Sequence, residues 1–259
     1  MMKKEMADMV VESNTTMPNG QYYRLKLRGE KPLLDCRPGQ FAEVRIDQSD
    51  VLLRRPVSIH FVDKERNELW LLIQKAGKGT TALSHIRSGE RLNLVYPLGN
   101  GFDEGQCGCR RPLLVGGGVG VAPLLMLGAS FKERGVEPTF LLGARRSVDL
   151  NELDEYEKYG RVLLTTEDGS AGEKGFVTQH SVLKTESFDA VFACGPTPMM
   201  KSVASYAVSK GIECEVSLEN HMACGIGACL CCVEDTKNGH RRVCADGPVF
   251  NIKDLKWQI

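Results

Sequence analysis

The sequence of 259 residues predicts a β plus α/β protein in three parts: an N-terminal antiparallel β-barrel, a doubly wound parallel α/β domain and a small C-terminal cluster domain. Three observations support this fold class. Short strands of alternating polarity fill the first hundred residues, strand–turn–helix units follow, and five of the ten cysteines lie between residues 221 and 244. We place the domains at residues 1–105, 110–218 and 219–259.

Composition excludes several classes of function. The chain has 33 basic and 33 acidic residues and no basic block, so nucleic acid is not an expected partner. No apolar run reaches the roughly 18–20 residues of a membrane helix, and the N-terminus lacks the apolar stretch of a signal peptide. We therefore expect a cytoplasmic protein with no membrane partner. Clustered thiols stay reduced there and are better interpreted as metal ligands or redox groups than as disulfides.

The barrel is predicted from five segments of the first hundred residues. Each is short, alternates in polarity and is bounded by Gly, Pro or Asn, which is typical of antiparallel strands in a barrel or sandwich. The segments are YYRLKLRG, QFAEVRI, RPVSIHFV, ELWLLIQK and RLNLVYPLG.

A glycine turn opens the α/β part. Residues 111–135 combine an apolar strand, a turn at Gly116–Gly120 and a helix with Pro123 in its first turn. The N–H groups of such a turn favour a phosphate. The third glycine is out of place for the dinucleotide fingerprint, however, and the next strand ends in Arg145 and Arg146 rather than in an acidic residue. A simple strand–helix connection is the alternative.

A second strand–turn–helix unit covers residues 188–211. Its strand leads through Cys194, Gly195 and Pro196 into a helix for which Thr197 is the expected N-cap. Cys194 then lies at the carboxyl end of a strand, where open α/β sheets bind ligands. Strands alternating with helices over residues 111–218 indicate a parallel, doubly wound sheet.

The cysteine cluster has the spacing Cys224-x4-Cys229-x2-Cys232-x11-Cys244. A C-x4-C-x2-C run with a distant fourth cysteine is typical of plant-type [2Fe–2S] centres, and the glycines of the first gap let the loop curl tightly. Structural zinc is the alternative, but zinc commonly uses two C-x2-C pairs or Cys/His sets. We expect these four cysteines to be the metal ligands and Cys231 to be a bystander.

Several motifs resemble, in order and spacing, those of the ferredoxin–NADP reductase superfamily: RPVS, the Gly79–Thr80 pair, GGGVGVAP and CGP. In that superfamily the barrel binds a flavin and the α/β domain binds a nicotinamide. The resemblance implies that Arg55 contacts the FAD diphosphate and that Ser58 lies near flavin N5. Gly79 and Thr80 would direct backbone N–H groups at the diphosphate.

The resemblance also extends the two cofactor sites, with departures. The superfamily often places a flavin-stacking tyrosine where this chain has Val57, after Pro56. It commonly has an aromatic residue and an arginine where this chain has Gln74 and Lys75, after Ile73. The resemblance also implies a set of NAD-binding residues, of which Cys194 would lie near the nicotinamide. They are Gly116, Gly117, Gly118, Gly120, Cys194, Gly195 and Pro196.

The C-terminal segments MACGIGACLCCV and VCADGPVF, with LLRRPVSI and PLGNGF, resemble the electron-transfer subunits of dihydroorotate dehydrogenase B over essentially the whole chain. This resemblance implies an NAD-linked oxidoreductase subunit of de novo pyrimidine (UMP) biosynthesis. Electrons would pass from an FMN-containing catalytic subunit through [2Fe–2S] and FAD to NAD+, in a heterotetramer with two copies of each subunit.

The chemistry agrees with this order of cofactors. Nicotinamide exchanges two electrons as a hydride and a [2Fe–2S] cluster exchanges one, so a flavin must lie between them. The chain offers no site for dihydroorotate oxidation itself, which we assign to the partner. Two alternatives remain: an NAD(P)H-linked flavin and iron–sulfur reductase subunit of another redox complex, such as a ferredoxin-linked transhydrogenase, and a zinc-binding module with a reductase-like fold.

The loop around the cysteines also predicts a contact surface. Its apolar residues are typical of an interaction site, although they could equally shield the cluster from water. They are Met222, Ala223, Ile226, Ala228 and Leu230.

Overall fold

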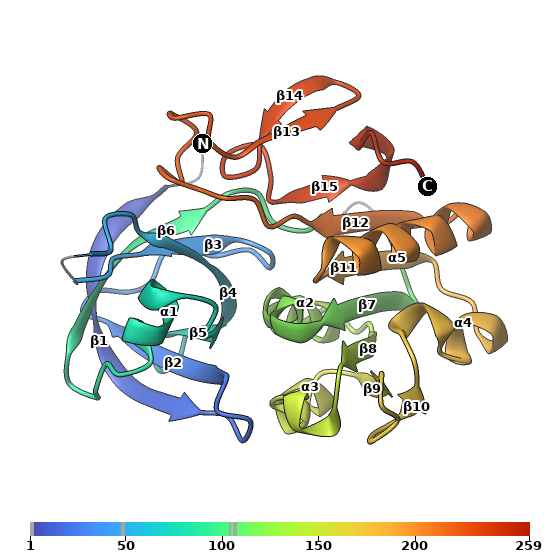
Figure 1. The fold of residues 1–259 in the computed structure, drawn as a ribbon, viewed down its shortest axis with the longest axis horizontal. Helices are drawn as coiled ribbons and strands as arrows, with labels where there is room; N and C mark the ends of the chain where they lie inside the picture. Colours follow the sequence, from blue (N-terminus) through green and yellow to red (C-terminus); the bar gives the residue numbers. More distant parts are fainter. Residues whose placement is uncertain (1–2, 48–49, 104, 106–107) are drawn as a thin grey trace. The chain divides into compact units, whose positions relative to one another are not determined.

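The computed structural model describes residues 3–47, 50–103, 105 and 108–259 (Figure 1). The chain divides into two compact units. The first comprises residues 1–101, 219–234 and 241–248, and the second comprises residues 102–218, 235–240 and 249–259. The first unit therefore combines the N-terminal hundred residues with the cysteine-rich segment. The three domain boundaries expected from the sequence remain predictions.

The first unit is built on a closed antiparallel barrel, which confirms the predicted N-terminal fold. Its strands follow the order β1-β2-β5-β4-β3-β6 around the barrel. Leu25, Leu71 and Ile59 are fully buried in it, as expected of strands that direct alternate apolar side chains inward. The barrel elements are β1 (Glu5–Thr16), β2 (Tyr22–Gly29), β3 (Phe41–Val44), β4 (Arg55–Asp63), β5 (Glu68–Gln74), α1 (Lys78–Leu83) and β6 (Arg91–Leu98).

The second unit contains a sheet in the order β10-β9-β8-β7-β11-β12-β15, in which every pair except β12–β15 is parallel. This confirms the predicted parallel α/β fold. Its strands are β7 (Pro112–Gly117), β8 (Thr139–Ala144), β9 (Arg161–Thr166), β10 (Glu173–Lys174), β11 (Ala190–Cys194), β12 (Glu213–Ser217) and β15 (Val249–Asn251). Its α-helices are α2 (Ala122–Glu133), α3 (Leu153–Glu157), α4 (Val182–Thr185) and α5 (Thr197–Lys210), with 3-10 turns η1 (Gly118–Val121), η2 (Ser147–Asp149), η3 (Val177–Gln179) and η4 (Ile252–Asp254).

The strand order reverses at β7. From β7 the chain continues to β8 and β9 on one side of the sheet, and later to β11 and β12 on the other. In open α/β sheets, ligands bind outside the carboxyl ends of the strands at such a switch point. The glycine turn follows β7 and the Cys194–Pro196 turn follows β11, so both turns lie at this point.

Helix α5 begins one residue earlier than the sequence suggested. We expected Thr197 as the N-cap, but Thr197 is the first helical residue and Pro196 is the cap, with no side-chain hydrogen bond. The expected first-turn position of Pro123 in α2 is confirmed. A residue without a capping hydroxyl thus occupies the cap of α5, and Pro198 lies in the first turn, where its missing N–H costs nothing.

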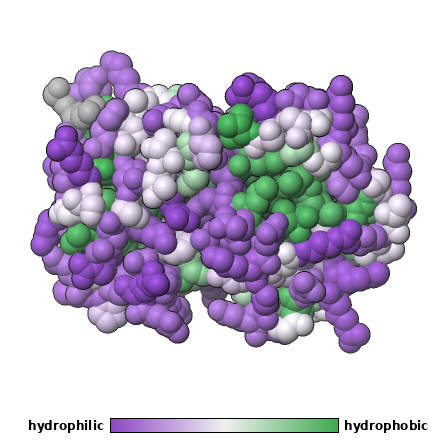
Figure 2. Space-filling model, turned by 90° about the horizontal axis from the view of Figure 1, so that it is seen from below, coloured by the Kyte–Doolittle hydropathy of each residue, from purple (hydrophilic) through white to green (hydrophobic). Residues whose placement is uncertain are grey.

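The outer edge of the sheet is partly apolar. Among the described residues, β10 pairs only with Thr165 and Thr166 of β9, and Val162–Leu164 remain partly exposed. Figure 2 shows apolar side chains gathered on the second unit when the molecule is seen from below.

The remaining strands are β13 (Val233–Thr236) and β14 (Gly239–Arg242), which pair with each other. No helix in the described part of the chain is both long and apolar enough to cross a membrane.

Candidate cofactor and iron–sulfur sites

The RPVS motif opens strand β4 and is held in register with β3. Arg55 pairs with Val44, Pro56 with Glu43, Val57 with Ala42, and Ser58 with Phe41. Val57 is buried, whereas Arg55, Pro56 and Ser58 are partly exposed. The motif thus leaves its first, second and fourth residues partly exposed, while Val57 packs inside the unit.

Arg55 and Gly79 lie in direct contact, although they are distant in sequence. A β-carbon added at Gly79 would lie 2.9 Å from Nε of Arg55, so the guanidinium passes over the backbone where α1 begins. Nη1 of Arg55 also donates to the carbonyl of Leu53 at 2.7 Å. A fixed arginine beside an N-terminal helical turn suits a diphosphate, which binds through charge-assisted hydrogen bonds. This geometry fits FAD.

Hydrogen bonds to its hydroxyl and its carbonyl hold Thr80 in place. Its hydroxyl accepts from the amides of Ala76 and Gly77 at 2.9 and 3.1 Å, and its carbonyl accepts from the Tyr23 hydroxyl at 2.6 Å. Burial raises the pKa of Tyr23, so this phenol stays a donor. Because its hydroxyl and its carbonyl are both engaged, the backbone N–H of Thr80 is the group left to meet a ligand.

The residues Ile73, Gln74 and Lys75 connect β5 to this turn. Ile73 is buried and pairs with Tyr23, and the Lys75 amide donates to the carbonyl of Gln21 at 2.8 Å. Gln74 and Lys75 are partly exposed. Gln74 and Lys75 therefore precede Gly79 by five and four residues in the chain. Ile73 is instead packed in the interior of the unit.

The two turns of the second unit interlock at the switch point. Cys194 is in register with Gly116, and it is buried. A β-carbon at Gly120 would lie 2.5 Å from the Cys194 carbonyl oxygen and from the Cα of Gly195. Only glycine allows the turns to approach so closely. The structure thus brings together the residues expected to bind NAD.

Gly117 and Gly118, also expected to bind NAD, likewise stand where the backbone requires glycine. A β-carbon at Gly117 would lie 2.5 Å from the sulfur of Met199 and 3.3 Å from the ring of Pro196. Gly118 has a φ of +57°, so it takes the left-handed conformation that starts the 3-10 turn. These glycines fit a tight turn at the carboxyl edge of the sheet, where a dinucleotide phosphate would bind.

Tyr156 braces this turn and was not identified from the sequence. Its hydroxyl donates to the carbonyl of Val121 at 2.9 Å, and its ring meets Phe140 edge to face at 5.3 Å. Burial holds the pKa of Tyr156 well above its usual range, so it remains a donor. No sequence signal links Tyr156 to a turn 35 residues earlier.

The cysteine-rich loop curls through three left-handed residues. Gly225, Gly227 and Leu230 have φ values of +65°, +85° and +59°. The amides of Ala228 and Cys229 both point at the sulfur of Cys224, at 3.3 and 3.4 Å. Backbone N–H groups directed at a ligand sulfur are the arrangement expected around an iron–sulfur cluster.

The four cysteines form two pairs. The side chains of Cys224 and Cys229 are hydrogen-bonded to each other, and the Cys244 amide donates to the sulfur of Cys232 at 3.3 Å. Within the described residues, no three or more His, Cys, Asp or Glu side chains converge as ligands of one metal ion would. Two thiol pairs are the donor set of a two-iron cluster, in which each iron takes two protein ligands. The residues therefore fit a [2Fe–2S] cluster.

The thiols of this loop differ in environment. Burial tends to raise the pKa of Cys224, but the N–H groups around its sulfur outweigh it and lower the pKa. Burial, together with the neighbouring Cys232, raises the pKa of Cys244. Cys232 and Cys244 are buried, Cys224 is partly exposed, and Cys229 and Cys231 are exposed. Cys231 belongs to neither pair.

Glu43 is a second residue that sequence reasoning missed. It is only 2% exposed, and neither carboxylate oxygen has a hydrogen-bond partner in the described part of the chain. Its side chain lies against Gly225 of the cysteine loop. Burial raises the pKa of Glu43 to about 7, against the opposing effect of Arg54. An acidic residue inside the apolar strand QFAEV was the signal available.

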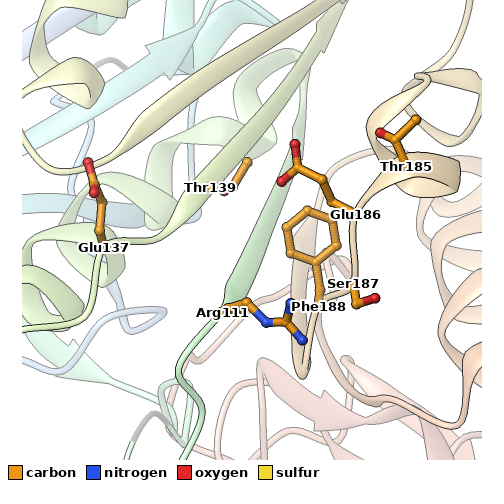
Figure 3. Close-up of a pocket in the computed structure, with 7 residues that line it drawn as sticks. All are labelled: Arg111, Glu137, Thr139, Thr185, Glu186, Ser187 and Phe188. Atoms are coloured by element: carbon orange, nitrogen blue, oxygen red, sulfur yellow. The ribbon is translucent and has the colours of Figure 1, made fainter.

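A cavity of about 310 Å³ lies elsewhere in the second unit (Figure 3). Arg111 precedes β7, Thr139 begins β8 and Phe188 precedes β11, so this cavity is at the amino ends of the strands. Figure 3 shows Glu186 and Phe188 above the Arg111 side chain. The cavity is therefore at the opposite end of the strands from the two interlocked turns.

Comparison with known families divides the chain in the same order as the motifs. Residues 8–102 match the oxidoreductase FAD-binding domain, and residues 114–205 match the oxidoreductase NAD-binding domain. Residues 219–256 match the iron–sulfur cluster binding domain of dihydroorotate dehydrogenase B. The chain thus carries an FAD-binding, an NAD-binding and an iron–sulfur domain.

Individual proteins are similar over nearly the full length. The electron transfer subunit of dihydroorotate dehydrogenase B (NAD+) from Shouchella clausii is 38% identical, over 98% of this chain and 99% of that protein. The subunit of the same name from a Geobacillus species is 42% identical, over 90% and 92%. A solved NADH-dependent reduced ferredoxin–NADP oxidoreductase superposes with a TM-score of 0.85 at 30% identity, over 96% of this chain and 90% of that one.

Proposed function

Because the chain belongs to the family of electron-transfer subunits of dihydroorotate dehydrogenase B, we propose that it carries electrons from a dihydroorotate-oxidising subunit to NAD+ in de novo pyrimidine biosynthesis. It is an oxidoreductase subunit with FAD, NAD and iron–sulfur binding domains. Dihydroorotate oxidation itself belongs to a catalytic partner subunit, for which we propose FMN as the cofactor.

The observation that carries this proposal is the position of strand β3. On one side β3 is hydrogen-bonded to β4, with Glu43 opposite Pro56 of the flavin motif. The Glu43 side chain in turn contacts Gly225, next to Cys224. Strand side chains project from the face of a sheet and adjacent strands are about 4.8 Å apart, so the cysteine loop packs on the face of β3, one strand away from the flavin motif. Such proximity supports direct electron exchange between the two cofactors.

The chain's own residues have distinct tasks in this proposal. When bound, a flavin can exchange a hydride with nicotinamide and single electrons with an iron–sulfur cluster. Arg55 and the backbone at Gly79 and Thr80 hold the diphosphate. Ser58, opposite Phe41, donates or accepts a hydrogen bond at the reactive ring edge. The buried apolar residues of β3 and β4, Phe41, Ala42 and Val57, exclude water.

The NAD site is proposed at the switch point of the second unit. The turn Gly116–Gly120 holds the dinucleotide phosphate through backbone N–H groups, and Cys194 with Gly195 and Pro196 borders the nicotinamide. Arg146 forms an ion pair with Asp149 at 3.3 Å. The similarity to subunits named for NAD(+) supports NAD over NADP.

The partner is proposed to dock on the cysteine loop. Ile226 and Leu230 are 54% and 62% exposed and lie four residues apart in the same loop. They stand among the cluster ligands, of which Cys229 is itself exposed. Exposed apolar groups at a redox centre suit a subunit contact.

We further propose a cytoplasmic heterotetramer with two copies of each subunit.

Tests of the proposal begin with the isolated chain. Anaerobic NADH titration should bleach the flavin absorbance and generate the electron paramagnetic resonance (EPR) signal of a reduced [2Fe–2S] cluster. Affinity purification from the native cell should then recover an FMN-containing subunit that oxidises dihydroorotate. Recovery of a ferredoxin-linked subunit instead would favour the alternative redox complex, which the 30% identity to a ferredoxin–NADP oxidoreductase makes the second candidate.

A further inference from the structure

Arg242 joins the two parts of the proposed ligand set. It ends β14 and lies two residues before Cys244. Its Nε and Nη2 atoms donate to the two carboxylate oxygens of Asp246, at 3.0 and 3.1 Å. Its Nη1 atom donates to the carbonyl of Gly227 in the cysteine loop, at 3.2 Å. One guanidinium therefore links the turn that carries Cys244 to the loop that carries the other three cysteines.

The carbonyl that Arg242 holds belongs to a peptide group that also faces a ligand sulfur. In a trans peptide the C=O of Gly227 and the N–H of Ala228 point in opposite directions. The Ala228 nitrogen lies 3.3 Å from the sulfur of Cys224. Fixing the oxygen on one side therefore directs the N–H at the sulfur on the other.

The contact between Arg242 and the loop is close-packed. A β-carbon at Gly227 would lie 2.9 Å from the side chain of Ala245 and 3.2 Å from Nη1 of Arg242. The backbone of Arg242 is also anchored, since its amide donates to Asp246 at 2.8 Å and its carbonyl accepts from the Asp246 amide at 2.7 Å. Arg242 is thus held rigidly enough to orient the peptide group.

We propose that Arg242 is a positioning residue that sets the reduction potential of the iron–sulfur cluster by orienting the Gly227–Ala228 peptide group toward the sulfur of Cys224. Hydrogen bonds to cluster sulfurs and local charge are among the factors that set such potentials. An N–H donor stabilises the reduced cluster more than the oxidised one, because the reduced cluster carries the additional negative charge. This inference rests on the proposed role of Cys224 as a ligand.

The test is an EPR-monitored redox titration of the purified full-length chain, with iron and FAD content measured in parallel. Arg242→Gln should shift the cluster toward the oxidised form by about two- to tenfold at a fixed potential, as expected for one hydrogen bond. Tenfold corresponds to about 59 mV for a one-electron couple. Arg241→Gln is the matched control, because Arg241 is an exposed arginine on the same strand, and it should leave the potential unchanged.

Two further variants separate orientation from charge. Arg242→Lys keeps the charge, but an ammonium group cannot bind Asp246 and Gly227 at once as the planar guanidinium does. Most of the decrease in reduction potential expected for Arg242→Gln should therefore also occur in Arg242→Lys. Asp246→Asn removes a negative charge, which by charge alone would raise the potential. Without the Asp246 carboxylate, however, the Arg242 guanidinium no longer holds the Gly227 carbonyl, which lowers the reduction potential. We expect this second effect to be the larger one, so the potential of Asp246→Asn should be lower than that of wild type.

Several results would overturn the inference. They are an unchanged potential in Arg242→Gln, full restoration by Arg242→Lys, or a raised potential in Asp246→Asn. If Arg242→Gln loses its iron altogether, the other two variants decide the question. A wild-type chain that binds FAD but never a [2Fe–2S] cluster would overturn the proposed function as well, so the two failures are distinguishable.

Discussion

Glu43 of β3 packs directly against Gly225, the residue after Cys224: a β-carbon at Gly225 would lie 2.5 Å from Cγ of Glu43. The carboxylate is buried, and neither of its oxygens has a hydrogen-bond partner in the described part of the chain. A buried acid of this kind connects the barrel to the cysteine loop and makes that junction sensitive to pH.

The first prediction concerns Glu43 and stability. Burial raises its pKa in the folded protein to about 7, above the ordinary value of 4.5. The folded protein therefore binds this proton more tightly than the unfolded chain. The stability that Glu43 contributes is fully present below pH 4.5 and is lost as the pH rises through 7.

Glu43→Gln should remove this dependence. We expect the variant to be more stable than wild type at pH 8 by about 1–3 kcal/mol, and to differ little at pH 5. Thermal unfolding followed by circular dichroism across this range measures the difference, with Glu133→Gln on exposed α2 surface as the control. A variant that is less stable at pH 8 and keeps the wild-type slope would contradict the assignment.

The second prediction concerns FAD. Arg55→Ala removes a charge-assisted hydrogen bond worth about 1.5–3 kcal/mol, so FAD should bind about 10- to 150-fold more weakly. Equilibrium dialysis with flavin fluorescence measures this affinity. Arg66→Ala is the matched control, because Arg66 is an exposed barrel arginine paired with Asp63. Unchanged affinity in Arg55→Ala would place the flavin site elsewhere.

The third prediction concerns the ligands. Ser in place of Cys224, Cys229, Cys232 or Cys244 should abolish the cluster, because a hydroxyl is a poor substitute for an iron-bound thiolate. Cys231→Ser, next to a ligand in the same loop, should retain it. Iron and sulfide analysis with visible spectra reads out each variant. Loss of iron in Cys231→Ser, with retention in one of the other four, would require a different ligand set.

The fourth prediction concerns partner docking. Ile226→Glu or Leu230→Glu places a charge on the exposed loop surface, so binding to the catalytic subunit should fail. FAD, cluster and NADH oxidation by artificial acceptors should survive. Co-purification and dihydroorotate-dependent NAD+ reduction measure the loss. Phe176→Glu is the control, since Phe176 is 61% exposed in the second unit. Full coupled activity in both loop variants would mean that the partner docks elsewhere.

The fold class and the expected cluster ligands could be predicted from local sequence patterns. Alternating polarity identifies the barrel strands, and glycine turns after apolar strands identify β7 and β11, because both signals lie within a few residues. The cysteine spacing likewise reports a local loop. The register that places Glu43 beside the flavin motif, by contrast, depends on strand pairing between distant segments.

Contacts between distant residues could not be predicted. Tyr156 supports Val121, and Arg242 reaches Gly227, through hydrogen bonds that no sequence period encodes. Thr197 was wrongly expected as a cap because its residue type is favoured there, whereas the chain places Pro196 at that position. Such details are decided by tertiary packing, which overrides local preference.

The most direct test of the central claim is anaerobic NADH formation in a mixture of this chain, the catalytic subunit, dihydroorotate and NAD+. We predict NADH formation only when both subunits are present, and its loss in Cys244→Ser, which should still oxidise NADH with an artificial flavin acceptor. Undiminished dihydroorotate-dependent NADH formation by a Cys244→Ser chain shown to lack iron, or none by the wild-type mixture, would contradict the account.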